Sequence, residues 1–250
     1  MSAFAQMIKA DNPGIMTLDG TNTWILRAPD SSTSVVIDPG PNDEAHLAAI
    51  VAAAGDIELV LFTHHHFDHT ECIDRLVELT GAPTRAIGEE WCRDAEPVVD
   101  GELLNVAGVA LEIVATPGHT TDSMSILITD DGSLLTGDTI LGRGTTVIAW
   151  PDGVLGPYLD SLARIRELVL EGVATRFLPG HGPVVEDPLP FIDFYLEHRE
   201  ERLDQVRAAL AAGASTPLEV VEVVYADVDK ILWGAAEMSV RAQLAYLNAG

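Results

Sequence analysis

Cysteine is scarce in this sequence, and long apolar runs are missing. The 250 residues include only Cys72 and Cys92, too few for a disulfide scaffold, and we interpret both as reduced thiols. The first residues, MSAFAQMIKADNPG, lack the basic start and apolar stretch of a secretory signal. No run of about 18 apolar residues follows that could cross a membrane. These absences predict a cytoplasmic protein with no membrane association.

Basic residues are scarce as well. Lys and Arg number 14 against 39 Asp and Glu, which gives a net charge of -25. A surface this acidic repels polyphosphates and anionic membranes, whereas nucleic-acid affinity rests largely on cationic contacts with phosphates. The charge disfavours RNA as a partner and argues for no DNA partner at all.

What is present is an alternation of short β-branched runs with helical patterns, which is typical of an α/β fold. With 47% hydrophobic residues, the chain can bury one sizeable core and a small appended module. Asp131-Gly132 predicts a hairpin turn in ITDDGSLLT. Helices are expected over residues 43–54, 68–79 and 158–170, the first of them ending on Gly55.

The last quarter of the chain has a purely helical sequence pattern, unlike the part before it. Two prolines in VVEDPLP, residues 184–190, precede three purely helical stretches. Thr216, Pro217 and Glu219 form an N-cap, N1-proline and capping-box signature for the middle stretch. We therefore expect a first domain over residues 1–187 and a small helical module, a bundle or helix-turn-helix-like unit, over residues 188–250.

Histidines crowd into THHHFDHTE, residues 63–71, which holds four of the chain's eight. A lone histidine is usually a satisfied polar residue, but several imidazoles buried without partners would each cost about 1–3 kcal/mol. A bound metal ion can accept a lone pair from several of these imidazoles at once and so removes this cost. An extended segment presents His64 and His66 as alternate side chains, and a tightening turn aims Asp68 and His69 elsewhere. Nitrogen ligands for one metal and mixed nitrogen and oxygen ligands for a second are typical of zinc.

Further candidate ligands directly follow apolar runs. IELVLF leads to His64, LEIVATPG to His119, GSLLTG to Asp138 and RFLPG to His181. Sites in α/β sheets gather at the edge where strands end and loops begin. We therefore expect four separate segments to bring these side chains to one place.

Together, THHHFDH, PGHT, TGD and PGHG resemble the metallo-β-lactamase superfamily. The resemblance implies an αββα metallo-β-lactamase sandwich with a dinuclear site for two Zn²⁺ ions, although Mn²⁺ or Fe²⁺ can occupy such sites in relatives. It implies one zinc on His64, His66 and His119, a second on Asp68, His69 and His181, and Asp138 bridging both. Asp138 stands where true β-lactamases have cysteine, as in the glyoxalase II and RNase Z branches. A β-lactam is therefore not the default substrate.

A narrower resemblance covers nearly the whole chain. NPGIMTLDGTNTWIL, VIDPGP, GDTILGRGTTVI and PGHGPVVEDP with LEHREERLDQV are similar to the beta-lactamase-like protein two family. This resemblance implies a C-terminal winged helix, and the family's vertebrate members are single-strand-specific endoribonucleases. Glu71 and Cys72 depart from the small residues usual after the histidine motif. The chain stops at residues 248–250, where the β-wing would begin, so the winged-helix-like domain is expected to lack its wing.

The predicted chemistry is hydrolysis by a metal-bridging hydroxide, because a metal pair lowers the pKa of bound water to about 7. Asp68 is the candidate catalytic residue that orients this hydroxide and accepts a proton. The expected substrate is an ester, thioester or lactone-type small molecule. The alternatives are an endoribonuclease that cleaves single-stranded RNA and a weak β-lactamase activity.

The C-terminal domain raises the further alternative of a DNA-binding regulator. Residues 188–250 contain five basic against ten acidic residues, which disfavours it. We expect this domain instead to shape the mouth of the cleft or to mediate formation of a homo-oligomer.

Further predictions concern substrate contacts and supporting residues. Asn22, Arg143 and Tyr158 lie in segments expected to border the cleft, although a turn or hairpin role is commoner for such residues. Arg143 could pair with a phosphate or carboxylate on the substrate. Thr63 and Thr120 are candidates for fixing the histidine tautomers.

Overall fold

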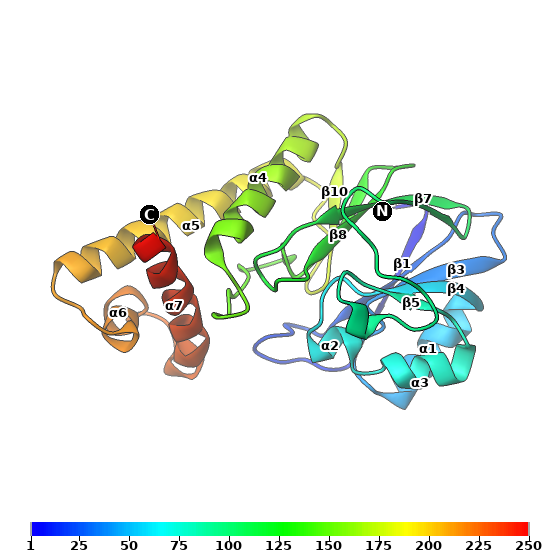
Figure 1. Cartoon of the computed structure of the whole chain (residues 1–250), viewed down its shortest axis with the longest axis horizontal. Helices are drawn as coiled ribbons and strands as arrows, with labels where there is room; N and C mark the ends of the chain where they lie inside the picture. Colours follow the sequence, from blue (N-terminus) through cyan, green and yellow to red (C-terminus); the bar gives the residue numbers. More distant parts are fainter. Residues whose placement is uncertain (1, 250) are drawn as a thin grey trace.

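The computed structural model describes residues 2–249 and shows two five-stranded sheets stacked face to face, with helices outside them (Figure 1). The first sheet has the order β1 (Ala5–Lys9), β2 (Asn22–Leu26), β3 (Thr33–Ile37), β4 (Asp56–Leu61) and β5 (Thr84–Arg85). The second has the order β10 (Arg176–Pro179), β9 (Ser133–Gly137), β8 (Met124–Ile128), β7 (Val109–Ala115) and β6 (Leu103–Val106). The predicted αββα sandwich is confirmed.

Three apolar layers hold the sandwich together. The layer between the sheets includes Leu61, Leu111 and Leu135. Helices α1 (Glu44–Ala54) and α3 (Ile73–Thr80) cover the outer face of the first sheet, and α4 (Leu155–Leu170) and α5 (Pro188–Ala211) cover that of the second. Strands β2, β8 and β9 are buried at every residue because both of their faces are covered.

Local signals explain several element boundaries. Asp43 caps α1 by accepting from the His46 backbone N–H at 2.7 Å, and Gly55 ends the helix at a φ of 66°. Strands β8 and β9 form the predicted hairpin, with Gly132 at a φ of 71° in its turn. Helix α4 begins at Leu155, three residues before the predicted start at Tyr158.

The single helix predicted over residues 68–79 is wrong. The chain instead forms α2 (Phe67–Thr70) and then α3, with a break at Glu71 and Cys72. Cys72 is fully buried in the layer under α1, and burial raises its pKa to about 12. Glu71 accepts from the Asn42 backbone N–H at 3.2 Å. The break lets α2 face the sheet edge while α3 packs against the sheet.

The C-terminal part is helical, with α5, α6 (Pro217–Val224), the short 3₁₀ helix η2 (Lys230–Leu232) and α7 (Trp233–Ala249). The capping box of α6 is present as predicted. Helix α5 serves two cores: Tyr195 packs with α4, and Val206 packs with α6 and α7. The boundary at residues 187 and 188 therefore stays a prediction. None of the helices between residues 2 and 249 combines the length and the hydrophobicity that a bilayer-spanning segment needs.

Candidate metal centre

All seven predicted ligand side chains meet at one edge of the sandwich. They follow or lie near the ends of four strands, with His64 and His66 after β4, Asp68 and His69 on α2, His119 after β7, Asp138 directly after β9 and His181 after β10. Their ligating atoms fall into groups whose members lie within 4.8 Å of one another. Such spacing is what simultaneous contact with a metal ion requires.

One group, which we call the nitrogen half, consists of His64, His66 and His119. The Nδ1 atom of His66 lies 3.1 Å from the Nε2 atom of His64 and 3.1 Å from that of His119. Burial lowers the pKa of all three imidazoles, that of His66 to about 4. The nitrogen half therefore presents neutral imidazoles, whose lone pairs are free to bind a metal.

The second group, the carboxylate half, consists of Asp68, His69 and His181. The Oδ2 atom of Asp68 lies 3.0 Å from His181 Nε2 and 3.4 Å from His69 Nε2, and the two Nε2 atoms are 3.3 Å apart. Burial opposes a charge on these imidazoles, but the nearby carboxylates outweigh it and raise the pKa of His69 to about 9 and that of His181 to about 11.

Asp138 lies between the two halves. Its Oδ2 atom is 3.3 Å from His181 Nε2 and 3.8 Å from His119 Nε2, and its Oδ1 atom is 3.6 Å from His69 Nε2. Burial would raise the pKa of Asp138, but His181 and His69 hold it well below its usual range. Its buried Oδ1 has no hydrogen-bond partner among the described residues. A buried, unpaired carboxylate oxygen beside imidazole nitrogens fits a divalent cation, which would displace the protons from the carboxylate half.

Asp38, which the sequence analysis did not single out, supports one histidine of each half. Its Oδ2 atom lies 3.0 Å from His69 Nδ1 and accepts from Thr63 Oγ1 at 2.7 Å. Because Thr63 Oγ1 donates to Asp38, it accepts from His64 Nδ1 at 3.0 Å. Both imidazoles thus carry a proton on Nδ1 and turn Nε2 to the centre. Its position in the sequence could have identified Asp38 as a site residue, because it directly follows β3 as the ligands follow other strands.

Backbone carbonyls orient two other imidazoles. His119 Nδ1 donates to the Val147 carbonyl at 2.9 Å, and His181 Nδ1 lies 3.2 Å from the Gly20 carbonyl oxygen. Each contact leaves Nε2 free to face the centre. The pre-oriented nitrogens lower the conformational cost of binding a metal.

Glycine precedes both histidines of the Pro-Gly-His turns for steric reasons. Gly118 has a φ of 133°, and a Cβ there would lie 2.3 Å from Tyr158 Cα. A Cβ at Gly180 would lie 2.6 Å from Asp138 Oδ1. Close packing around the centre therefore requires both glycines.

His65 is the histidine of the cluster that turns away from this centre. Its Nδ1 lies 2.8 Å from Asp122 Oδ1 and its Nε2 lies 3.5 Å from Asp152 Oδ2. Thr120 donates to the same Asp122 carboxylate at 2.7 Å. The predicted role of Thr120 in fixing a ligand tautomer is therefore wrong, whereas Thr63 makes such a contact.

The structure buries two of the predicted substrate contacts. Tyr158 is fully buried, and its hydroxyl donates to the Thr139 carbonyl at 2.7 Å. Asn22 is buried as well, and its Nδ2 donates to the carbonyls of Pro179 at 3.0 Å and Gly182 at 2.8 Å. Both side chains join segments that are distant in the sequence, so they shape the edge of the sandwich without being accessible to a substrate.

A cavity of about 90 Å³ opens beside the centre, with His119 and Asp138 in its wall. Its other walls are mostly apolar, and they include Ile15, Met16, Leu18, Leu141 and Val147. Arg143 also lines it, but its Nη1 and Nη2 atoms each lie 2.8 Å from a carboxylate oxygen of Asp19. The charge of Arg143 is therefore already matched within the chain, and its contact with a substrate stays a prediction.

Comparison with known proteins agrees with this geometry. The family model described as Metallo-beta-lactamase superfamily matches residues 16–181, and that of the Beta-lactamase associated winged helix domain matches residues 216–249. The chain therefore belongs to the metallo-beta-lactamase superfamily, whose members are hydrolytic enzymes that bind divalent metals, often in pairs. Both the predicted fold and the predicted enzyme class are confirmed.

Individual proteins are similar to this chain over most of its length. The Beta-lactamase-like protein 2 homolog of Caenorhabditis elegans is 34% identical over 233 residues, covering 88% of this chain and 76% of that protein. An Atrochrysone carboxyl ACP thioesterase of Aspergillus fumigatus is 33% identical over 235 residues, covering 86% and 71%. The crystal structure of a metallo-beta-lactamase family protein from Thermus thermophilus has a TM-score of 0.82 at 21% identity, covering 98% of this chain and 93% of that one.

Proposed function

We propose that this chain is a zinc-dependent hydrolase that opens an ester, thioester or lactone bond in a small molecule. The main support is the convergence of seven nitrogen and oxygen ligands beside a largely apolar cavity. His64, His66 and His119 would hold one metal, Asp68, His69 and His181 a second, and Asp138 both. When bound, such a pair supplies a water of lowered pKa and a Lewis acid for the scissile bond. The nitrogen-rich donor set suits zinc, and manganese or iron can also use it.

Asp68 is the carboxylate best placed to accept a proton. Its side chain is 27% exposed, against 10% for Asp138, so water and substrate reach it more easily. Burial would raise its pKa, but His69 and His181 lower the pKa below its usual value. Asp68 is therefore ionised at neutral pH, as a general base must be.

A small molecule that is apolar around its scissile bond suits this cavity better than a polynucleotide does. Hydrophobic side chains from residues 15–18 and 141–147 surround the space beside His119 and Asp138. The net charge of -25 opposes an approaching phosphate backbone. The relative from Aspergillus fumigatus is named as a thioesterase, and this adds weight to a thioester.

The test is hydrolysis by the zinc-loaded protein of a panel that contains a thioester, an ester, a lactone, a β-lactam and an end-labelled single-stranded RNA. We expect turnover within the first three compounds, with a loss of roughly 10²–10⁴-fold in Asp68→Ala and complete loss with a chelator. Asp74→Ala is the matched control, because Asp74 lies on the neighbouring α3 and pairs with Arg93 at 3.0 Å. Chelator-sensitive cleavage of RNA without turnover of the small molecules would overturn the proposal in favour of the endoribonuclease.

A further inference from the structure

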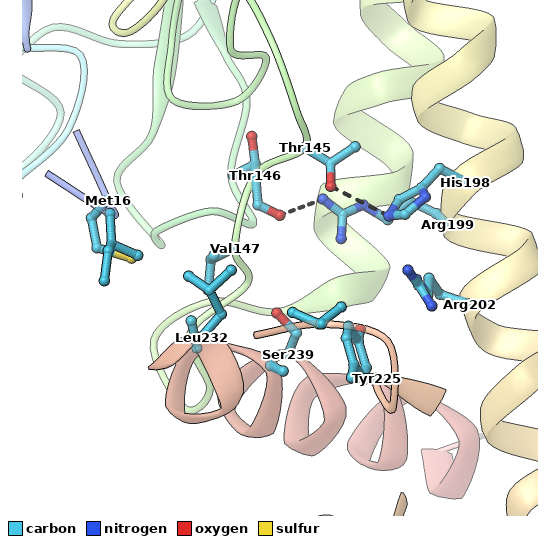
Figure 2. A pocket seen from close by; sticks show the side chains of 14 residues that line it. Met16, Thr145, Thr146, Val147, His198, Arg199, Arg202, Tyr225, Leu232 and Ser239 are labelled. Carbon is cyan, nitrogen blue, oxygen red and sulfur yellow. Dashed lines mark hydrogen bonds between the residues drawn. The ribbon is translucent and has the colours of Figure 1, made fainter. Parts of the chain in front are cut away.

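A second cavity, of about 260 Å³, adjoins the one beside the metal centre (Figure 2). The two share Ile15, Met16 and the loop of residues 145–147 in their walls. The remaining walls come from α5 and from the segment that runs from Tyr225 to α7. A molecule with its scissile bond at the metals could therefore extend along these shared walls toward the C-terminal helices.

Arg199 makes the second cavity unusual. Arg199 is only 4% exposed, and one of its guanidinium nitrogens donates to the Thr146 carbonyl (Figure 2). The guanidinium carbon lies 5.0 Å from the centre of the Tyr158 ring. Its buried Nε has no hydrogen-bond partner, and no carboxylate within the described chain forms an ion pair with it. A buried cation without a counter-charge is unfavourable unless an anion joins it.

Arg202, one turn further along α5, also lacks a carboxylate partner in the part of the chain that the structure describes. It donates to Gln205 Oε1 at 2.8 Å and to the Val224 carbonyl at 3.2 Å, and it lies 4.7 Å from the centre of the Tyr225 ring. Arg207, on the same helix, instead pairs with two carboxylates. The chain has 39 acidic residues, yet this cavity is lined by two such arginines and by no acidic side chain. The cavity therefore favours an anionic ligand.

The pKa of His198 reflects the positive electrostatic potential in the second cavity. Its Nε2 lies 3.3 Å from Thr145 Oγ1, as Figure 2 shows. Burial and then the neighbouring Arg199 and Arg202 lower its pKa to about 4. An anion in the cavity would counter this field, and His198 and Thr145 would add neutral hydrogen-bond groups.

We propose that this second cavity binds a phosphate group at the far end of a small-molecule substrate, whose scissile bond lies at the metal centre. Two guanidinium groups can donate several hydrogen bonds to one phosphate. Apolar residues such as Val228, Leu232 and Ala236 would contact the arm that joins the phosphate to the scissile bond. The inference rests on the proposed hydrolase function, and it adds a substrate class: phosphorylated esters or thioesters.

The test measures binding of two probes that differ only in a phosphate, S-methyl-4′-phosphopantetheine and S-methylpantetheine, to the zinc-loaded protein by calorimetry. Neither is hydrolysed, and the thioether avoids coordination of a free thiol to zinc. We expect the phosphorylated probe to bind at least about tenfold more tightly, which corresponds to about 1.4 kcal/mol. Arg202→Gln should remove that preference, and Arg207→Gln, the matched control on α5, should keep it.

Equal affinity for the two probes in the unchanged protein would overturn the inference. An undiminished preference in Arg202→Gln would overturn it as well, because the phosphate would then be bound elsewhere, for example by the metals. A 5′-phosphorylated oligoribonucleotide is the third probe: if Arg202→Gln weakens only its binding, the small-molecule assignment fails. A phosphate preference that depends on Arg202, without turnover of any thioester, ester or lactone of the panel, would support the cavity's role while refuting the proposed function.

Discussion

The nitrogen half and the carboxylate half of the candidate metal centre lie side by side but would bind cations on different physical grounds. The nitrogen half offers neutral imidazoles, which burial keeps unprotonated. The carboxylate half has negative charge nearby, and its imidazoles attract protons in the absence of a metal. Cation binding would therefore depend on ligand geometry in the nitrogen half and on charge balance in the carboxylate half. Substitutions and pH should act on them differently.

Asp138→Asn should have the largest effect, because this carboxylate lies between the halves. Replacing it removes a negative charge from both, and the amide nitrogen cannot bind a metal as the carboxylate oxygen does. We expect metal content below two per chain and an activity loss of roughly 10³-fold, about 4 kcal/mol of transition-state stabilisation. Elemental analysis and steady-state rates measure both. Asp130→Asn, on the same hairpin, is the control, and full metal content in Asp138→Asn would contradict a bridging role.

His66→Ala tests whether the halves can be separated. Removing one of three nitrogens should empty the nitrogen half and reduce the bound metal from about two to about one per chain. The neighbouring His65→Ala should keep both metals, because His65 faces Asp122 and Asp152. Equal losses in the two variants would mean that the cluster acts as a whole.

Asp38→Asn should have an intermediate effect. The amide can still accept from the Thr63 backbone N–H, but its Nδ2 donor would oppose the donor on His69 Nδ1. We expect metal affinity to fall by about 10–100-fold, measured by competition with a chelator. Thr63→Val should weaken binding less, because it acts only through His64. An unchanged affinity in Asp38→Asn would show that the tautomers are fixed by other contacts.

The smallest effect concerns the pH dependence of the chelated protein. His69 and His181 have folded-state pKa values raised to about 9 and about 11, above the unfolded value of about 6.5. Their contribution is fully present below about pH 6.5 and is lost as the pH rises through the folded values. The Tm of the chelated protein should therefore fall by a few degrees between about pH 7 and pH 10.

The metal-loaded protein should respond in the opposite way, because protons compete less for the imidazoles as the pH rises. The difference in Tm between loaded and chelated protein should widen with pH, which thermal denaturation at several pH values can follow. A chelated protein whose Tm stays constant across this range would contradict the charge difference between the halves.

Local patterns were enough to predict the layers of the fold and the place of the ligands. Asp138 directly follows β9, and His119 and His181 come shortly after β7 and β10. Strands that run in the same direction end at the same edge of a sheet, so these side chains are neighbours even though the loops between them differ. The α6 capping box and the Asp131-Gly132 turn are also properties of a few adjacent residues.

Features that depend on contacts between distant segments escaped prediction. The importance of Asp38 arises from its contact with His69, which lies 31 residues away. Tyr158 was misplaced because nothing nearby in the sequence reveals that its hydroxyl meets Thr139 inside the core. The helical pattern across Glu71 likewise hides the break that separates α2 from α3.

The candidate ligands carry only nitrogen and oxygen donors. Asp138 lies between the two halves, and Cys72 is buried in the core as a protonated thiol. Peroxide attacks thiolates and converts them stepwise to sulfenic and higher acids. Imidazoles and carboxylates do not undergo this oxidation, so oxidative stress that disables thiolate-ligated metalloenzymes should leave the metal centre of this chain intact.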